Sequence, residues 1–299
     1  MARLYREGLT FFSAVLILAS LLAASCATVK EAAVRPAGEF DGLADGAAVY
    51  FLLDVAAARP LLAAISRRIP SAAKASAALD LTESAAVALY GAGGPRRYFI
   101  AADGRYPTVR GSLSLALSPA WKKRTAETGA RYWRSDEGVS LAFRRGRAVL
   151  SDGEPFVSAP PPTPPAEYDA AGNGASLSGW VSEPASAIAG ALAGAGVPIR
   201  PPVNDLVFSL IPDTETERYF LEVRLVAASA ERSRALVAML KLARSALDGK
   251  DDFPLMSFLR TILSSAPKVD GPVVILRPEA LTAEEIALLC VDLSIYFKQ

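Results

Sequence analysis

Two stretches of the chain, residues 47–70 and 175–198, show the same pattern of apolar positions: a strand-like run followed by helical spacing. In each, a short apolar run predicts a strand, and apolar residues at helical spacing then predict a helix that ends near a proline. The expected strands are 49–55 and 177–181, and the expected helices begin at Arg59 and at Pro184. The equal length of the two stretches suggests an internal repeat.

A predicted hairpin follows each of these stretches. Residues 87–90, a turn and residues 97–100 correspond without a gap to residues 208–211, a turn and residues 218–221. Both second strands begin with Arg-Tyr-Phe, and glycine or Pro-Asp-Thr supplies the turn. Because this match follows a matching strand-helix pair, it strengthens the prediction of a diverged duplication.

The rest of the chain yields further elements. Expected helices cover 230–247, 253–263 and 281–293, the last capped by Thr282 with Glu285 three places on. A buried strand is expected at 272–276, a strand meander at 131–151 and a helix start at Ser118-Pro119. The alternating leucines 113, 115 and 117 fit either a strand or a short helix. The fold class is therefore α+β, with two related halves, each a mixed or antiparallel sheet with helices on one face in a ferredoxin-like βαββαβ order.

Proline placement sets the expected boundaries. Residues 154–166 contain six prolines, which stiffen the backbone and interrupt helices and central strands. The prediction is a signal peptide at 1–25, a lipidated N-terminus and tether at 26–46, a first half at 47–154, a linker at 155–174 and a second half at 175–299.

Composition excludes several classes of chemistry. The chain has 32 Lys and Arg, 31 Asp and Glu, and no histidine. The absence of histidine removes Ser-His-Asp and Cys-His nucleophile systems and histidine-bearing zinc sites. The only cysteines, Cys26 and Cys290, provide no disulfide framework. The net charge is close to zero, so the overall charge does not predict a polyanionic partner. Nucleic acid is not expected as a partner.

The N-terminal segment has the order of a secretory signal: Arg3 and Arg6, an apolar run from Leu9 to Leu22, then small residues before Cys26. The run falls short of the roughly 20 apolar residues that span a bilayer. Cleavage of an ordinary signal peptide near Ala24 or Ser25, with Cys26 as a bystander, is the alternative.

The stretch from Leu22 to Cys26 resembles the lipobox of bacterial lipoproteins, although Ala23 stands where leucine is usual. The resemblance implies a diacylglyceryl group on the Cys26 thiol, cleavage before Cys26 and a stable membrane anchor. The expected location is the cell envelope, periplasmic or surface-facing. Because Ala27 follows the cysteine, an outer membrane is favoured if the host has one.

The most uneven charge lies between Arg96 and Arg147, where 12 basic residues face four acids. With aromatic residues interleaved, this segment could contact an anionic envelope component such as lipid head groups or a wall polymer. The candidate contact residues are Lys122, Lys123, Arg124, Arg144, Arg145 and Arg147. Alternatives are a solvated sheet face with arginine stems on aromatic rings, or pairing with the acidic second hairpin (Asp205, Asp213, Glu215, Glu217 and Glu222).

The sequence offers no catalytic, cofactor or metal site. Adjacent acids such as Asp136-Glu137, Asp251-Asp252 and Glu284-Glu285 point in different directions on a strand or helix, so they do not form a catalytic pair. Asp54, inside an apolar strand, is expected to cap the strand end. The leading hypothesis is a membrane-anchored envelope lipoprotein with a binding or structural role, whose partner is an anionic envelope component or a protein. The alternatives are an envelope enzyme using carboxylate or lysine chemistry in a cleft between the halves, and a solute-binding lipoprotein.

Overall fold

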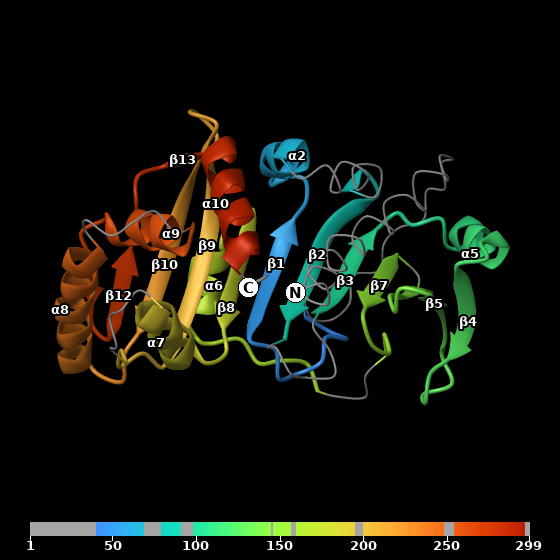
Figure 1. The fold of residues 1–299 in the computed structure, drawn as a ribbon, viewed down its shortest axis with the longest axis horizontal. Coiled ribbons are helices and arrows are strands. Elements are labelled where there is room, and N and C mark those ends of the chain that lie inside the picture. The colour runs from blue at the N-terminus through green and yellow to red at the C-terminus, as the bar shows by residue number, and fades with distance from the viewer. Residues whose placement is uncertain are drawn as a thin grey trace. The chain divides into compact units, whose positions relative to one another are not determined.

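The computed structural model describes residues 40–68, 79–90, 98–144, 146–156, 160–194, 200–247 and 254–296 (Figure 1). The chain divides into two compact units, Met1–Thr163 and Pro164–Gln299. The boundary lies within the proline-rich segment. Cys26 and the predicted signal peptide lie outside the described residues.

The first unit is built on an antiparallel sheet with the strand order β1-β2-β3-β7-β6-β5-β4. Its strands are β1 (Val49–Asp54), β2 (Thr82–Leu89), β3 (Tyr98–Gly104), β4 (Trp121–Thr125), β5 (Arg131–Ser135), β6 (Ser140–Arg144) and β7 (Arg147–Ser151). Two helices accompany it, α2 (Arg59–Arg68) and α5 (Thr108–Leu117). The predicted first strand and helix and the predicted meander are confirmed.

One face of this sheet carries the core of the unit. Ile100, Leu141 and Leu150 alternate with residues of the other face, as expected for strands, and pack with Trp121 and with Leu115 of α5. Leu115 and Leu141 are fully buried. Burial of this size stabilises by about 1.5–3 kcal/mol for each large side chain, so α5 is fixed on the sheet through Leu115.

The second unit has an antiparallel sheet ordered β11-β12-β10-β9-β8, with β13 also paired to β10. The strands are β8 (Leu177–Val181), β9 (Asp205–Asp213), β10 (Arg218–Val226), β11 (Lys268–Asp270), β12 (Val273–Leu276) and β13 (Leu281–Thr282). The helices are α6 (Tyr168–Gly172), α7 (Pro184–Gly194), α8 (Ala230–Leu247), α9 (Pro254–Leu263) and α10 (Ala283–Tyr296).

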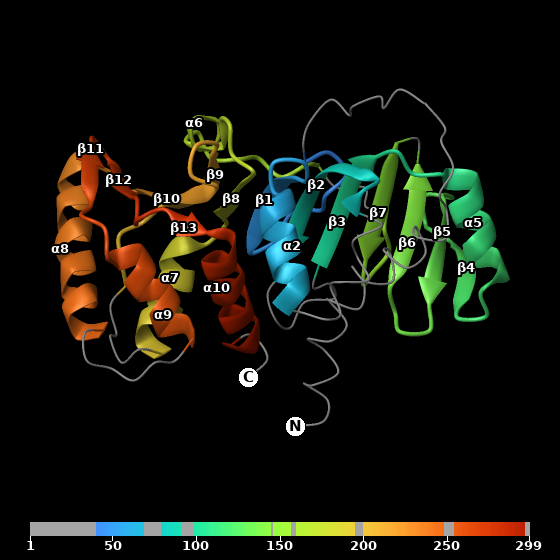
Figure 2. The ribbon, with the colours of Figure 1, turned by 90° about the horizontal axis from the view of Figure 1, so that it is seen from above.

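The two faces of this second sheet differ in character. Val223 and Leu225 of β10 pack with Leu236, Leu240 and other buried residues of α8 and α9. The alternate residues Glu222 and Arg224 point to the opposite face. Figure 2 shows α7, α9 and α10 on one side of this sheet and α6 on the other. Polar groups of β10 therefore lie on the α6 side.

The predicted cap of the last helix is confirmed. The Glu285 amide donates to the Thr282 hydroxyl at 3.2 Å, and the Thr282 amide donates to a Glu285 carboxylate oxygen at 2.7 Å. This reciprocal pair is a capping box, and it satisfies two amides that the first helical turn leaves unpaired. The hydrogen bonds from Thr282 lower the pKa of Glu285.

We expect Thr282→Ala to lower the free energy of unfolding by about 1 kcal/mol at neutral pH, because the hydroxyl loses its bonds to the Glu285 amide and to the Glu285 carboxylate. A carboxylate with a lowered folded-state pKa stabilises above its ordinary pKa, and this contribution disappears as the pH falls through the lowered value. The difference between the two proteins should therefore shrink in acid. Urea unfolding across a pH series measures it, and a difference that is constant down to strong acid would contradict the role of the ionised Glu285.

Residues 113–117, which fit either a strand or a short helix, belong to the helix α5. Two expectations need correction. No helix begins at Ser118-Pro119: Ser118 ends α5, the Trp121 amide donates to its carbonyl, and β4 follows this turn. The sheets also lack ferredoxin-like pairing. The strands that flank α2 would be parallel in a split βαβ unit, but β1 and β2 are direct antiparallel neighbours.

Candidate functional site

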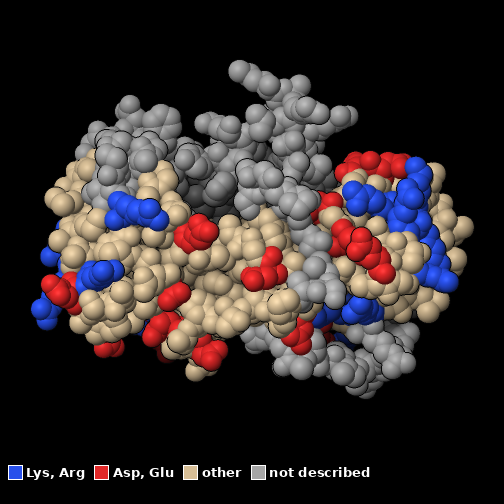
Figure 3. Space-filling view, turned by 90° about the horizontal axis from the view of Figure 1, so that it is seen from below, with Lys and Arg blue, Asp and Glu red and all other residues tan. Residues whose placement is uncertain are grey.

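The basic residues of β4 lie on the strand that ends the sheet order of the first unit. Only Trp121 of this strand is buried, and the four residues after it are exposed. In register, Lys122 pairs with Arg134 and Arg124 pairs with Tyr132. Directly paired residues share a face of an antiparallel sheet, so these basic groups gather on one face. In Figure 3, Lys and Arg side chains are concentrated at this end of the unit.

Several basic groups have local partners. Lys122 forms an ion pair with Asp136 at 2.9 Å, in which both side chains are more than half exposed. The Lys123 ammonium lies 5.9 Å from the centre of the Trp133 ring. The Arg144 guanidinium lies 4.5 Å from the Phe156 ring. Because an exposed ion pair is worth little in water, Lys122 remains available to a stronger anion.

The other two candidate residues differ from these. Arg145 lies outside the described residues. The Arg147 side chain is only 12% exposed and binds Asp103 through two nitrogens, each 2.7 Å from a carboxylate oxygen. The exposed basic surface therefore consists of Lys122, Lys123, Arg124 and Arg144.

An exposed apolar stripe follows one side of α5. Val109, Leu113 and Leu117 are 83%, 58% and 76% exposed, and their four-residue spacing places them on one helical face. On the opposite side, Leu115 is buried, and a Cβ on Gly111 would lie 3.1 Å from the Phe143 ring. The helix therefore fits closely to the sheet while its most apolar residues face outward.

The sequence contained a signal for this stripe, namely apolar residues at positions i, i+4 and i+8. The alternation of Leu113, Leu115 and Leu117 obscured it, because a period of two also fits a strand. The helix α5 and the exposed basic strand β4 are consecutive in the chain and lie close together. We call Val109, Leu113, Leu117, Lys122, Lys123 and Arg124 the edge surface.

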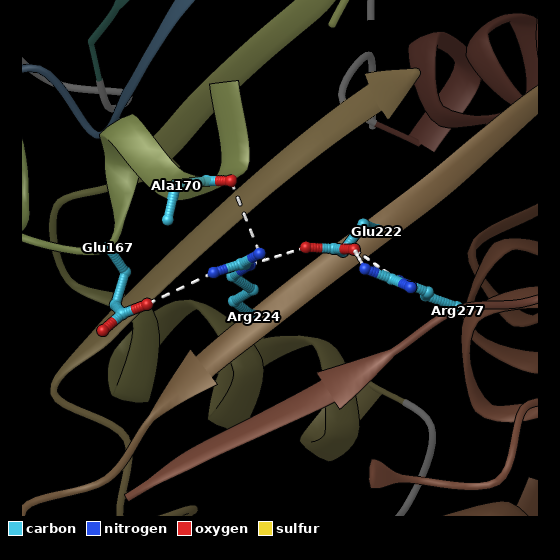
Figure 4. A network of polar contacts seen from close by, with 5 residues as sticks. All are labelled: Glu167, Ala170, Glu222, Arg224 and Arg277. Atoms are coloured by element: carbon cyan, nitrogen blue, oxygen red, sulfur yellow. Dashed lines mark hydrogen bonds and ion pairs between the residues drawn. The ribbon is translucent and has the colours of Figure 1, made fainter. Parts of the chain in front are cut away.

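A second polar cluster lies in the other unit, on the α6 side of its sheet (Figure 4). Glu222 is only 2% exposed and accepts from Arg224 Nε at 2.5 Å and from the guanidinium of Arg277. Arg224 also reaches Glu167 at 3.3 Å and the Ala170 carbonyl at 3.4 Å. A buried carboxylate is costly unless it is paired with opposite charge and hydrogen-bonded, and the two arginines supply both for Glu222.

This cluster is not arranged for general base catalysis. Two arginines occupy both oxygens of Glu222, so neither oxygen is directed toward a substrate. The hydroxyl of Ser209, which pairs in register with Glu222, is buried without a hydrogen-bond partner in the described part of the chain. The cluster is therefore a structural network that ties α6 to β10.

The remaining acids have structural positions. Asp54 is exposed and accepts from the Ala57 amide at 3.0 Å, so it caps the end of β1 as expected. Within the described residues, no group of three or more Cys, Asp or Glu side chains could hold a metal ion. Asp251 and Asp252 lie outside those residues.

Burial raises the pKa of two tyrosines in the first unit. Tyr106 packs in the core while its hydroxyl lies 2.8 Å from the Thr82 hydroxyl, and desolvation is the main cause of its raised pKa. Desolvation also raises the pKa of Tyr50, whose hydroxyl binds the Ala47 amide. Both phenols therefore stay protonated and act as hydrogen-bonding anchors. In the described part of the chain, no helix has the length and apolar character needed to span a membrane.

Comparisons with known proteins identify a similar fold. No family model matches the chain, and no curated protein matches it significantly. Three crystal forms of TP0453 from Treponema are similar in structure at 16% sequence identity. Form III has a TM-score of 0.59 over 85% of this chain and 98% of that chain, and form I has a TM-score of 0.56 over 87% and 98%. This α+β chain therefore has a fold similar to that of TP0453.

Proposed function

We propose that this protein is a cell-envelope lipoprotein, anchored through Cys26, whose folded body binds an anionic membrane through the edge surface. The observation that carries the binding role is the exposed apolar stripe on α5, followed in the chain by the exposed basic strand β4. The sequence from Arg3 to Cys26 supports the anchor and the envelope location, and Ala27 supports an outer membrane where the host has one.

The apolar stripe supplies the first part of the binding free energy. A soluble helix usually turns its apolar residues toward the core, whereas Val109, Leu113 and Leu117 of α5 face outward. Burying one such side chain gains roughly 1.5–3 kcal/mol. A contiguous exposed apolar surface of this kind commonly marks an interaction site.

The basic strand supplies the second part. Lys122, Lys123 and Arg124 are exposed on β4, the strand that follows α5. Lys123 lies on the sheet face where Trp121 packs with α5, and Lys122 and Arg124 lie on the other face of this terminal strand. Each basic residue near an anionic membrane is worth about 1 kcal/mol. The combination of apolar insertion and basic contacts is characteristic of proteins that lie in a membrane interface. A wall polymer has no apolar layer, so it would contact only the basic residues and leave the apolar stripe in water. The exposed stripe therefore favours lipid over a wall polymer as the partner.

The two units further support a diverged duplication. The predicted alignment maps the register pair Val49 and Leu89 of the first unit onto Leu177 and Leu210, which is the pair in the second. The bond from the Ala48 amide to the Leu89 carbonyl recurs as the bond from the Ser176 amide to the Leu210 carbonyl. The next strand pairs, β2 with β3 and β9 with β10, differ in register by two residues in this alignment. Because side chains alternate with a period of two, aligned residues still point to the same face of the sheet. The proposed repeat is therefore β-α-β-β with meander pairing.

We expect the non-lipidated full chain, with Cys26→Ser, to float with vesicles rich in phosphatidylglycerol and to bind phosphatidylcholine vesicles much more weakly. Leu113→Asp with Leu117→Asp should weaken binding to the anionic vesicles at least about tenfold, because apolar insertion is lost. Lys122→Glu with Arg124→Glu should weaken it and reduce its dependence on salt.

Leu242→Asp is the matched control, because Leu242 of α8 is also 63% exposed but lies in the other unit. Its binding should equal that of the parent chain. Equal binding by the α5 variant, or an equal loss in the Leu242 variant, would rule out the edge surface as the membrane contact.

A further inference from the structure

The residues before β1 are held on the sheet of the first unit. Within residues 40–47, which we call the strap, Phe40 is 5% exposed and Leu43 is 1% exposed. The hydroxyls of Tyr50 and Tyr90 donate to the Ala44 carbonyl at 3.1 and 2.8 Å. The strap is therefore part of the folded unit, although the sequence pattern placed it in the tether.

Arg147 fastens the other end of the strap. Its Nε and one Nη bind the two oxygens of Asp103, and the remaining Nη donates to the Asp41 carbonyl at 2.6 Å. Arg147 and Asp103 are paired in register on β7 and β3, so the sheet itself sets their positions. A guanidinium is planar and presents donors in several fixed directions, which lets one side chain bind a carboxylate and a carbonyl together.

The second unit contains a corresponding arrangement. The segment before β8 also lies on its sheet, where Tyr168 packs edge-on against Trp180 with ring centres 5.1 Å apart and binds the Ser178 hydroxyl. Arg224 binds Glu222 and donates to the Ala170 carbonyl of this segment. Gly46 and Gly174, which correspond in the alignment, both have positive φ angles, +84° and +74°. Each unit thus fastens its leading segment with an arginine held by a sheet carboxylate.

We propose that Arg147 and Asp103 form a clasp that holds the strap on the sheet and so keeps the link between Cys26 and the folded body short. This inference rests on the proposed lipid anchor for its second half. With the strap fastened, the link consists of residues 26–39. Release would add residues 40–47, which extends its maximum reach by about 25 Å.

The clasp is tested first on the full chain with Cys26→Ser, which does not depend on lipidation. Arg147→Lys keeps the charge but cannot bind both the carboxylate and the carbonyl. Hydrogen exchange followed by mass spectrometry should show amides of residues 43–47 exchanging at least about tenfold faster, with β2 amides unchanged. Arg105→Lys is the matched control, because Arg105 pairs with Glu83 in an exposed ion pair near the same end of β3.

The length of the link is tested on the lipidated protein. Neutron reflectometry on a supported bilayer should place the body of the Arg147→Lys variant farther from the membrane than the parent chain and the Arg105→Lys variant. Unchanged exchange in residues 43–47 would overturn the clasp. Faster amide exchange in residues 43–47, with an unchanged distance between the body and the bilayer, would show that the clasp does not determine the length of the link. Failure of the parent chain to bind the bilayer through Cys26 would instead refute the proposed anchor.

Discussion

Replacing Glu222 by Gln should lower the free energy of unfolding by about 3 kcal/mol. Glu222 is 2% exposed and its two oxygens accept from Arg224 and Arg277. A glutamine has one acceptor oxygen, so its amide group would face an arginine donor. The side chain of Arg224 is 16% exposed, and it would be left largely buried with only its longer contacts to Glu167 and the Ala170 carbonyl. Chemical denaturation followed by circular dichroism measures the loss.

The control is Glu215→Gln in the exposed turn between β9 and β10, which should change stability by less than about 0.5 kcal/mol. Arg277→Gln should cost about 1 kcal/mol, because the Arg277 side chain is 62% exposed and water can replace much of its interaction. If Glu222→Gln were as mild as Glu215→Gln, the network would not be holding α6 and the second sheet together.

Cys26→Ser should abolish retention of the protein by membranes that have been washed at high salt. The two or three acyl chains expected on this cysteine give stable anchoring, whereas serine cannot receive the thioether-linked lipid. In phase separation with a cloud-point detergent, the parent protein should enter the detergent phase and the variant the aqueous phase. The membrane binding proposed for the edge surface would be weaker than a lipid anchor, so it should not retain the variant after a high-salt wash.

Cys290→Ser is the control for general effects of cysteine loss, and it should leave the phase distribution unchanged. An intact protein mass for the parent chain that matches cleavage before Cys26 plus a diacylglyceryl group would identify the modification directly. If the parent and Cys26→Ser proteins separate alike, an ordinary signal peptide with Cys26 as a bystander becomes the better explanation.

The order of elements was largely predictable because periodicity and proline placement are local signals. The expected helix 230–247 coincides with α8, and the capping box of α10 follows from Thr282 and Glu285 alone. Strand pairing was not predictable in the same way. Ferredoxin-like and meander sheets can share one element order, and their difference lies in contacts such as Val49 with Leu89, which are distant in sequence.

The candidate site was predictable in part. The basic character of Lys122 to Arg124 is visible in the sequence, and the strand β4 leaves those residues exposed. Burial decided the rest. Arg147 and Glu222 look like surface charges in the sequence, but each meets its partner across neighbouring strands, and local patterns carry no information on such pairs. The outward direction of Leu113 likewise depends on Leu115 packing into the core instead.

The position of β4 at the end of a sheet has a consequence for the export proposed for this protein. A terminal strand presents backbone groups to which another chain can add, and such strands are a common origin of aggregation. Lysine and arginine at three consecutive positions of β4 repel a second copy of the same strand. The charges proposed to meet the membrane would therefore also keep newly exported molecules apart from one another until they reach it.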